Sequence, residues 1–501
     1  MRSYHHLFLL LSLALSTAAF AQVPPYTLQF VPDGFDTWPR TAKSAYYSFS
    51  EVVATPEYLV RMELPTAGKA KGILSTFVKD NATGRIVGQH DRVQPGGKEA
   101  YCDRLVQIGG NLYLIYETLD EKTGEVVVYA ERIALPTGRP EGEAKKIGSI
   151  SFDPKSLQWS GKLGVTLYTS SDGEYTAFYF DRLRSKEDEQ LVLVFMLDKE
   201  LDPVWQQGYR IAFDSEKIST SGVSVSDDGL VYALMGARFK NKAITNKEVN
   251  YEFQLFGMSK EGMASQMIDL EGSNDVLTCG LVLRNGTRPT VGGFYVESGS
   301  STEVTAGYFM CDVDPGMEAV PIPRNYLFRT PVEERMYGAR LFAKSDGSVF
   351  LTGNSRVSNG TSASESNLFA TFFDASLVEE WNTLVPKTLI TSKTDEDFGY
   401  RAFFGNDQLL LMVPELDENI IAHQQKGELK KIRKGADVRM VVGFSDTGVP
   451  TFAKFSGPEV YDFFLKWLPM DLAIQPGVHV IPCTKKEGKK EVMGKLVLKF
   501  E

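Results

Sequence analysis

The sequence predicts an all-β protein folded as a single β-propeller of seven or eight four-stranded blades. Three observations carry this prediction. Short runs rich in Val, Tyr, Phe, Leu and Thr alternate with turns rich in Gly, Asp, Asn and Ser along the chain. One type of hairpin turn recurs at a nearly constant interval. Runs such as Leu191–Leu197 are apolar on both faces, as sheets stacked face to face require.

The recurring turn is a Gly-Gly, Asp-Gly or Asn-Gly pair followed by an apolar strand. Its second residue is Gly110, Gly173, Gly229, Gly286, Gly347 and, in degraded form, Asn406, at intervals of 56 to 63 residues. Asp-Gly and Asn-Gly suit a tight hairpin because both central residues can adopt positive φ. A second turn follows in each unit, so a repeat of about 59 residues contains four strands, A to D, which is typical of a propeller blade.

The second turn is marked in two units by the spacing Asp-x-x-Leu-x-x-x-Trp. It occurs as Asp198, Leu201 and Trp205, and again as Asp374, Leu377 and Trp381. Because the two tryptophans hold the same place in the repeat, we expect both to be buried, equivalent structural residues between blades.

The two ends of the chain carry separate predictions. Residues 1–21 are expected to be a signal peptide, because Arg2 precedes the apolar run Leu7–Leu15 and an Ala-x-Ala cleavage site ends at Ala21. Export to the periplasm or the cell exterior follows, and residues 22–501 then form the propeller. No later segment has the roughly 18 apolar residues of a membrane-spanning helix.

The ring is expected to close by strand pairing between its ends. Val478–Pro482 and Lys495–Phe500 are predicted to pair with Tyr26–Phe30, which removes two exposed sheet edges. Residues 22–501, divided by a repeat of about 59 residues, give close to eight blades. Seven blades with an elaborated closure is the alternative. Glu459–Trp467 is the one segment compatible with a short helix.

Residue usage predicts no catalytic residues, no cofactor and no metal site. The three histidines after Ala21, His90, His423 and His479, have no zinc-ligand spacing and are expected at the surface or in turns, with His479 half-buried in the closing strand. The net charge of -10 argues against general nucleic-acid binding. The four cysteines allow three disulfide pairings after export, or remain buried thiols: Cys102, Cys279, Cys311 and Cys483.

The loops between strands B and C form the predicted binding face, because long loops on a rigid scaffold commonly carry function. These loops are Asp181–Glu189, Gly236–Asn250, Glu297–Glu303, Ser355–Asn367 and Pro414–Asp437. Two of them are basic within an acidic protein, and the residues concerned are Arg238, Lys240, Lys242, Lys430, Lys431, Arg433 and Lys434. They predict contact with a protein or an acidic glycan, with solvated loop charge as the alternative.

Several segments resemble uncharacterised secreted propeller-like proteins of Gram-negative bacteria. They are Tyr168–Tyr175, Val223–Tyr232, Gly405–Leu411 and the two Asp-x-x-Leu-x-x-x-Trp segments. The resemblance covers about Leu163–Phe500 and implies an exported propeller, with no activity attached to it. The expected function is a non-enzymatic binding or scaffold module. The alternatives are a glycan-active propeller enzyme, hydrolase or lyase, and an accessory subunit of an outer-membrane complex.

The C-terminal end has a rival interpretation. Gly477–Ile481 and Lys495–Leu498 are similar to the final strands of type IX secretion sorting domains, which would make this end a detachable signal processed near Pro469. Ring closure is favoured, because Leu409–Val413 and Met440–Phe444 already belong to a blade and leave no room for a separate domain.

Overall fold

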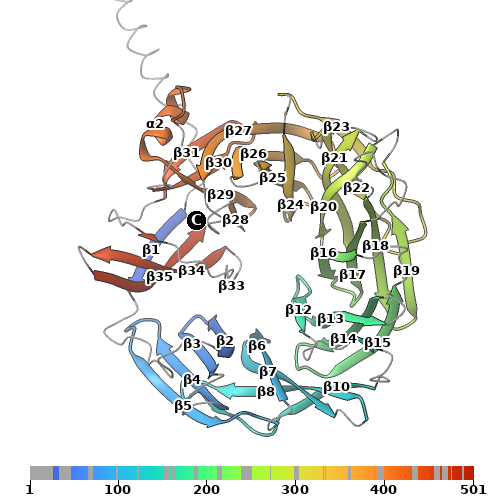
Figure 1. Ribbon diagram of the computed structural model, residues 1–501, viewed down its shortest axis with the longest axis vertical. Coiled ribbons are helices and arrows are strands. Elements are labelled where there is room, and N and C mark those ends of the chain that lie inside the picture. The colour runs from blue at the N-terminus through green and yellow to red at the C-terminus, as the bar shows by residue number, and fades with distance from the viewer. Residues whose placement is uncertain are drawn as a thin grey trace, which may run out of the picture.

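The protein is an eight-bladed β-propeller, seen as a ring of small antiparallel sheets in the computed structural model (Figure 1). The structure describes residues 26–32, 47–65, 72–96, 100–120, 123–151, 157–158, 164–185, 190–211, 217–238, 251–270, 272, 274–297, 304–330, 332, 334–358, 363–391, 400–430, 438–455, 463–464, 472–475, 477–487 and 490–500. The predicted fold class is confirmed, and the blade count is eight. The expected signal peptide lies outside the described residues.

Blades 1 to 4 follow one another along the chain. Blade 1 contains β2 (Tyr47–Ala54), β3 (Tyr58–Pro65), β4 (Ile73–Asp80) and β5 (Ile86–Val93). Blade 2 contains β6 (Ala100–Ile108), β7 (Asn111–Asp120), β8 (Glu125–Ala134) and β10 (Lys145–Ser151), with β9 (Arg139–Pro140) also paired to β8. Blade 3 contains β11 (Leu157–Gln158) and β12 (Thr166–Thr169), both paired to β13 (Tyr175–Ser185), then β14 (Gln190–Asp198) and β15 (Pro203–Ile211). Blade 4 contains β16 (Lys217–Val225), β17 (Val231–Arg238), β18 (Tyr251–Ser259) and β19 (Gly262–Met267).

Blades 5 to 8 complete the ring. Blade 5 contains β20 (Asn274–Arg284), β21 (Arg288–Glu297), β22 (Gly307–Asp312) and β23 (Arg324–Leu327). Blade 6 contains β24 (Arg335–Ala343), β25 (Val349–Ser358), β26 (Ala363–Phe373) and β27 (Glu379–Thr391). Blade 7 contains β28 (Arg401–Gly405), β29 (Gln408–Glu415), β30 (Val438–Phe444) and β31 (Pro450–Lys454), with helix α2 (Asp417–Gln425) between β29 and β30. Blade 8 contains β32 (Phe463–Phe464), β33 (Leu472–Gln475), β34 (Val478–Glu487), β35 (Lys490–Phe500) and the N-terminal β1 (Tyr26–Pro32).

The ring closes between its two ends, as the sequence predicts. Strand β1 pairs antiparallel with β35 in continuous register from Tyr26↔Phe500 to Pro32↔Gly494. Strand β35 in turn pairs with β34, so the C-terminal strands are the inner part of blade 8. Each end of the chain covers an edge that would otherwise be unpaired.

The recurring turns join strands A and B of successive blades. The glycine in the second position has φ between 71° and 83° at Gly110, Gly173, Gly229, Gly286 and Gly347, and blade 7 uses Asn406 and Asp407 with φ of 49° and 59°. These angles explain the Gly, Asn and Asp preference, since other side chains are strained there. Since each blade is a meander, A–B and C–D turns share one face of the ring, here called the turn face, and B–C loops lie on the other.

The core is divided into layers between neighbouring blades. One cluster joins Val192, Val194 and Met196 of blade 3 to Val231 and Met235 of blade 4. Seven such clusters occur among the described residues, one for each interface from blades 1–2 to blades 7–8. Inner strands are therefore buried on both faces, whereas outermost strands such as β5 and β19 alternate or are largely exposed.

Helical structure is minor and differs in place from the expectation. Of Glu459–Trp467, the described residues are Phe463 and Phe464, which form β32; the rest lies outside the described residues. Helix α2 lies instead within the predicted B–C loop Pro414–Asp437. Within the described ranges, no helix combines the length and apolar content needed to cross a bilayer.

Candidate functional site

The structure describes two of the seven predicted basic residues, Arg238 and Lys430. Arg238 is the last residue of β17, and Lys430 is the last described residue after α2. The other five, Lys240, Lys242, Lys431, Arg433 and Lys434, lie outside the described residues. Contact between the B–C face and an anionic partner therefore stays a prediction.

Lys430 is held beside helix α2 by a buried asparagine. The Asn419 side chain donates to the Lys430 carbonyl and accepts from the Lys430 N–H, each at 2.8 Å. The Lys430 Nζ lies 2.6 Å from the Glu418 Oε2, in an exposed ion pair. Such pairs contribute about 0–1 kcal/mol, so the structural role of this loop rests on Asn419 rather than on the lysine charge.

Two histidines are more buried than the sequence predicts. The His423 side chain, 4% exposed, stacks on Phe452 at 4.7 Å between ring centroids and lies 3.6 Å from the Glu415 Oε2. His479 is 5% exposed, and its Nε2 lies 3.1 Å from the Phe404 carbonyl of blade 7. The surface expectation for His423 is wrong, because the loop that carries it folds back as a helix against β31.

The three cysteines whose side chains are described, Cys102, Cys279 and Cys311, are buried, and Cys279 and Cys311 are free thiols. Burial raises the pKa of Cys279 and raises that of Cys311 to about 12, so both are neutral thiols. The Cys483 side chain lies outside the described residues. Among those described, no group of His, Cys, Asp or Glu has the arrangement of a metal site.

The Asp-x-x-Leu spacing forms the same C–D turn in blades 3 and 6. The carboxylates of Asp198 and Asp374 each accept two N–H groups of the following turn, at 2.7 to 3.0 Å. Leu201 and Leu377 have φ of 62° and 57°, and both side chains are buried. The aspartate therefore stabilises a turn in which the leucine three positions later has a strained, positive φ. This shared turn explains why the Asp-x-x-Leu spacing occurs in both blades.

Trp205 and Trp381 hold equivalent places in strand D but differ in burial. Trp381 pairs with Phe372 across the strands and is 3% exposed. Trp205 pairs with Met196 and is half-buried, with its indole N–H donating to the Gly229 carbonyl of blade 4 at 3.2 Å. Both tryptophans thus reach the next blade, and Trp381 is the more buried of the two.

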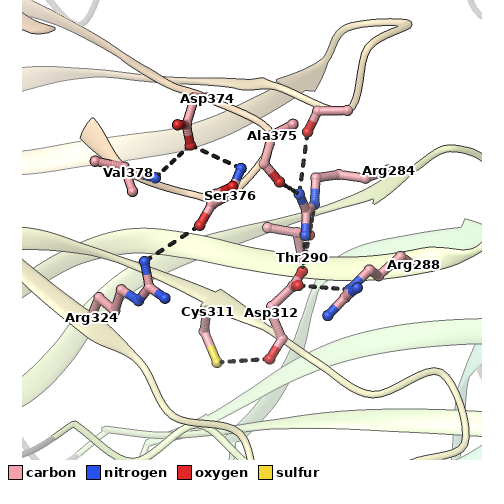
Figure 2. Close-up of polar contacts among 11 residues, drawn as sticks. Arg284, Arg288, Thr290, Cys311, Asp312, Arg324, Asp374, Ala375, Ser376 and Val378 are labelled. Atoms are coloured by element: carbon pink, nitrogen blue, oxygen red, sulfur yellow. Dashed lines mark hydrogen bonds and ion pairs between the residues drawn. The ribbon is translucent and has the colours of Figure 1, made fainter. Parts of the chain in front are cut away.

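A buried arginine of blade 5 is hydrogen-bonded to blade 6 at the turn face (Figure 2). The Arg284 side chain is 5% exposed and pairs with Asp312. Its Nε donates to the Thr290 Oγ1 at 2.9 Å, and its Nη1 donates to two carbonyls of blade 6, Ala375 at 2.7 Å and Gly347 at 3.3 Å. One guanidinium therefore satisfies an acid, a hydroxyl and two turns of the neighbouring blade.

Asp312 also holds a second, more exposed arginine. Arg288, whose side chain is 55% exposed, places its Nε 2.6 Å from the Asp312 Oδ2. Figure 2 shows Arg324 reaching the Ser376 carbonyl of blade 6 from the other side, at 3.4 Å. Arg284 and Arg324 of blade 5 thus donate to carbonyls of the blade 6 C–D turn, whereas Arg288 binds only Asp312 among the described contacts. The next interface around the ring has the opposite charge.

That next interface, between blades 6 and 7, encloses a cavity of about 410 Å³ that opens on the turn face, here called the blade 6–7 cavity. Its volume falls within the range of about 300–1,000 Å³ found for ligand pockets. The lining comes from the A–B and C–D turns of both blades and from the strand residues beneath them.

The floor of the blade 6–7 cavity is aromatic. Phe350 and Phe372 lie 4.8 Å apart between ring centroids, and Trp381 lies 6.1 Å from Phe372 and stacks on Phe444 at 5.4 Å. Gly448 lets the blade 7 turn approach the indole, because a Cβ there would lie 2.5 Å from Trp381 and its φ is +76°. The aromatic surface is therefore built by packing that tolerates little movement.

The rim of the cavity is acidic. It carries one ammonium, that of Lys344, and five carboxylates: Asp346, Asp374, Glu380, Asp407 and Asp446. The Lys344 Nζ lies 5.3 Å from the centroid of the Phe372 ring and 3.7 Å from the Asp346 Oδ2. The pKa of Asp346 is lowered, chiefly because the Ser348 hydroxyl donates to it, so it is a carboxylate at neutral pH.

Two of these carboxylates also have structural partners. Asp374 holds its own turn, and Asp407 accepts the Ser345 N–H of blade 6 at 2.8 Å. In contrast, the exposed carboxylates of Glu380 and Asp446 accept no hydrogen bond from the described residues. At the wall, the Oε1 of Gln408 is buried and accepts no hydrogen bond among the described residues. The cavity thus offers aromatic faces, negative charge and a buried acceptor.

Part of this site carries a sequence signal. Asp374 and Trp381 belong to the spacing singled out above, and Asp346 belongs to a recurring turn. This signal alone does not indicate a site, because the lining combines four segments far apart in the sequence. Only the stacking of blade 6 on blade 7 joins them.

Comparisons with known proteins assign no function to the chain. No family model matches the chain, and no curated protein matches it. The chain is similar to the WD40 domain of SCAP from fission yeast, at 8% identity and a TM-score of 0.38, covering 95% of this chain and 94% of that one. It is also similar to the β-propeller domain of the Trilobed protease from Pyrococcus furiosus, at 10% identity and a TM-score of 0.34, covering 82% of this chain and 96% of that one.

Proposed function

We propose that this protein is a non-enzymatic binding module, exported from the cytoplasm, and that the blade 6–7 cavity is its ligand site. The observation that carries the proposal is the cavity itself: about 410 Å³, with an aromatic floor and a charged rim, on a ring whose last blade is completed by β1. Concave sites of this size with a few polar groups are where propellers and other scaffolds bind small ligands.

Binding is favoured over glycan cleavage by the state of the carboxylates. Glycoside hydrolysis needs a carboxylic acid that stays protonated near neutral pH, beside a second carboxylate. The pKa of Asp346 is shifted the opposite way, and Asp374 and Asp407 are engaged with turn N–H groups. Among the described residues that line the cavity there is no His or Cys to act as base or nucleophile.

The proposal is tested by closing the cavity without touching the core. Ala375 lines the cavity and is exposed, so Ala375→Trp should fill it, while Ala264→Trp on the exposed edge strand β19 is the matched control. A panel of small cationic, neutral and anionic organic compounds is screened by thermal shift against the wild type and both variants. A bound ligand raises stability by about 2.7 kcal/mol at 100 times its Kd.

The expected result is at least one compound that stabilises the wild type and Ala264→Trp but not Ala375→Trp. Equal stabilisation of all three proteins would place the ligand elsewhere and remove the cavity from the proposal. Export is tested separately, because sequencing of the mature protein should begin at Gln22, and an intact Met1 would contradict it.

A further inference from the structure

We infer that the blade 6–7 cavity binds a primary alkylammonium group, that of a free amine or of a lysine side chain. This inference rests on the proposed function and specifies its ligand class. It starts from charge: five carboxylates and one ammonium line the cavity, so the rim is strongly negative. Charges in a concave site focus the field and raise the local concentration of cations while repelling anions.

The aromatic floor provides the second half of the recognition. A cation over an aromatic face within about 6 Å of the centroid is attracted by the ring quadrupole. The floor also offers apolar contact to a short alkyl chain, which a hydrated metal ion or a polar sugar would not use as fully. An ammonium with an apolar stem matches both parts.

Lys344 already occupies the position that such a ligand would take. Its Nζ lies 5.3 Å from the Phe372 centroid and 3.7 Å from the Asp346 Oδ2, and the side chain remains 24% exposed. The protein thus places its own alkylammonium between the aromatic floor and an acid of the rim. Because the Asp346 side chain is 60% exposed, its pair with Lys344 is weak, and an incoming ammonium can displace Lys344 toward solvent.

The wall residue Gln408 has a side-chain acceptor without a partner among the described residues. The Oε1 of Gln408 is buried without a hydrogen-bond donor among the described residues, which is unfavourable for a polar atom. An ammonium carries three donors and no acceptor, so it can satisfy an amide oxygen and carboxylates together. An anion or a pure acceptor would leave this oxygen unpaired.

The test uses calorimetric titration of the full chain with four-carbon probes that differ in charge: n-butylammonium, n-butanol and butyrate. Two further probes, an N-acetylated Gly-Lys-Gly amide and its norleucine counterpart, distinguish a lysine side chain from a free amine. The variants are Lys344→Met, which keeps the stem, and Glu380→Gln with Asp446→Asn. The control Lys199→Met removes another exposed turn-face lysine, which pairs with Glu174 in blade 3.

The cationic probes should bind, the neutral probes should bind more weakly, and butyrate should not bind. Lys344→Met should tighten butylammonium binding about two- to fivefold because the internal competitor is removed, whereas the double rim variant should weaken it by a similar factor. Lys199→Met should change neither. Preference for the lysine peptide over butylammonium identifies a protein partner, and the reverse identifies a small amine.

Weaker cation binding in Lys344→Met, with an unchanged melting temperature, would overturn the inference. So would equal affinity for butanol and butylammonium, or binding of butyrate. If a neutral or anionic compound stabilises the protein in a way that Ala375→Trp abolishes, the ligand class is wrong and the proposed function stands. If nothing in the earlier panel is sensitive to Ala375→Trp, the proposed function fails as well.

Discussion

Replacing Arg284 should weaken the ring at a single interface. This side chain is 5% exposed and joins Asp312 and Thr290 of blade 5 to two carbonyls of blade 6. The substitution Arg284→Met keeps the length and apolar stem of the side chain and removes its five donors. The variant therefore separates the effect of the Arg284 hydrogen bonds and ion pair from that of the packing around its stem.

The expected loss of stability follows from what remains behind. Breaking a buried ion pair typically costs about 3–5 kcal/mol, because the surviving partner is left uncompensated. Asp312 is 26% exposed and keeps Arg288, which lowers that part of the loss. The carbonyls of Gly347 and Ala375, however, lose their donor at about 1–3 kcal/mol for each group that water cannot reach. A total of about 3 kcal/mol is expected.

The assay is urea unfolding of the wild type, Arg284→Met and the matched control Arg288→Met, followed by Trp fluorescence. Arg288 binds the same carboxylate but is 55% exposed, so its loss should cost only about 0–1 kcal/mol. Arg284→Lys should fall between the two, since it keeps the charge and loses the fork of donors. If Arg284→Met lowers the free energy of unfolding no more than Arg288→Met does, the Arg284 hydrogen bonds do not hold blades 5 and 6 together.

Four further outcomes follow from closure, packing and burial. Deleting Lys485–Glu501 removes β35, which is the whole pairing partner of β1, so the melting temperature should fall in one cooperative step; unchanged melting would contradict ring closure. Trp381→Ala should cost about 3–5 kcal/mol, and the half-buried Trp205→Ala distinctly less, so equal losses in denaturation would contradict the difference in burial. Burial raises the pKa of Cys311 to about 12, so an alkylating reagent at about pH 8 should label it only after unfolding, and mass spectrometry would show otherwise if the thiol were accessible. Burial also raises the pKa of Tyr400 to about 12; because the unfolded state ionises first, the free energy of unfolding should decline between about pH 10 and 12, and a flat curve would argue against it.

The architecture could be predicted from the sequence because its causes are local. A turn that needs positive φ selects Gly, Asn or Asp, and so Gly173, Gly229 and Gly347 mark the repeat wherever the blades stand in space. The same holds for Asp374, whose carboxylate bonds the turn immediately after it. Strand pairing of the two ends was predictable as well, since a meander of blades must pair or cover its outer edges.

Burial of individual side chains was only partly predictable. Trp205 and Trp381 share one spacing, yet the neighbours that enclose each belong to the next blade, and those neighbours differ. The sequence predicts a loop around His423, but that loop contains helix α2. The helix places the His423 imidazole against the Phe452 side chain. Such differences depend on residues roughly half a repeat to one repeat away, which the local pattern does not record.

The sequence by itself therefore determined the class of fold, the order of its strands, the positions of its turns and the pairing of its ends, because each depends on backbone conformation or on periodicity over a few residues. The tertiary structure alone decided where a ligand could bind. Lys344, Phe372, Asp407 and Phe444 meet only when blade 6 stacks on blade 7, and Arg284 finds its carbonyls only across the interface before it. Contacts of this kind are set by the packing of whole sheets, so their charge and shape exist only once the ring is closed.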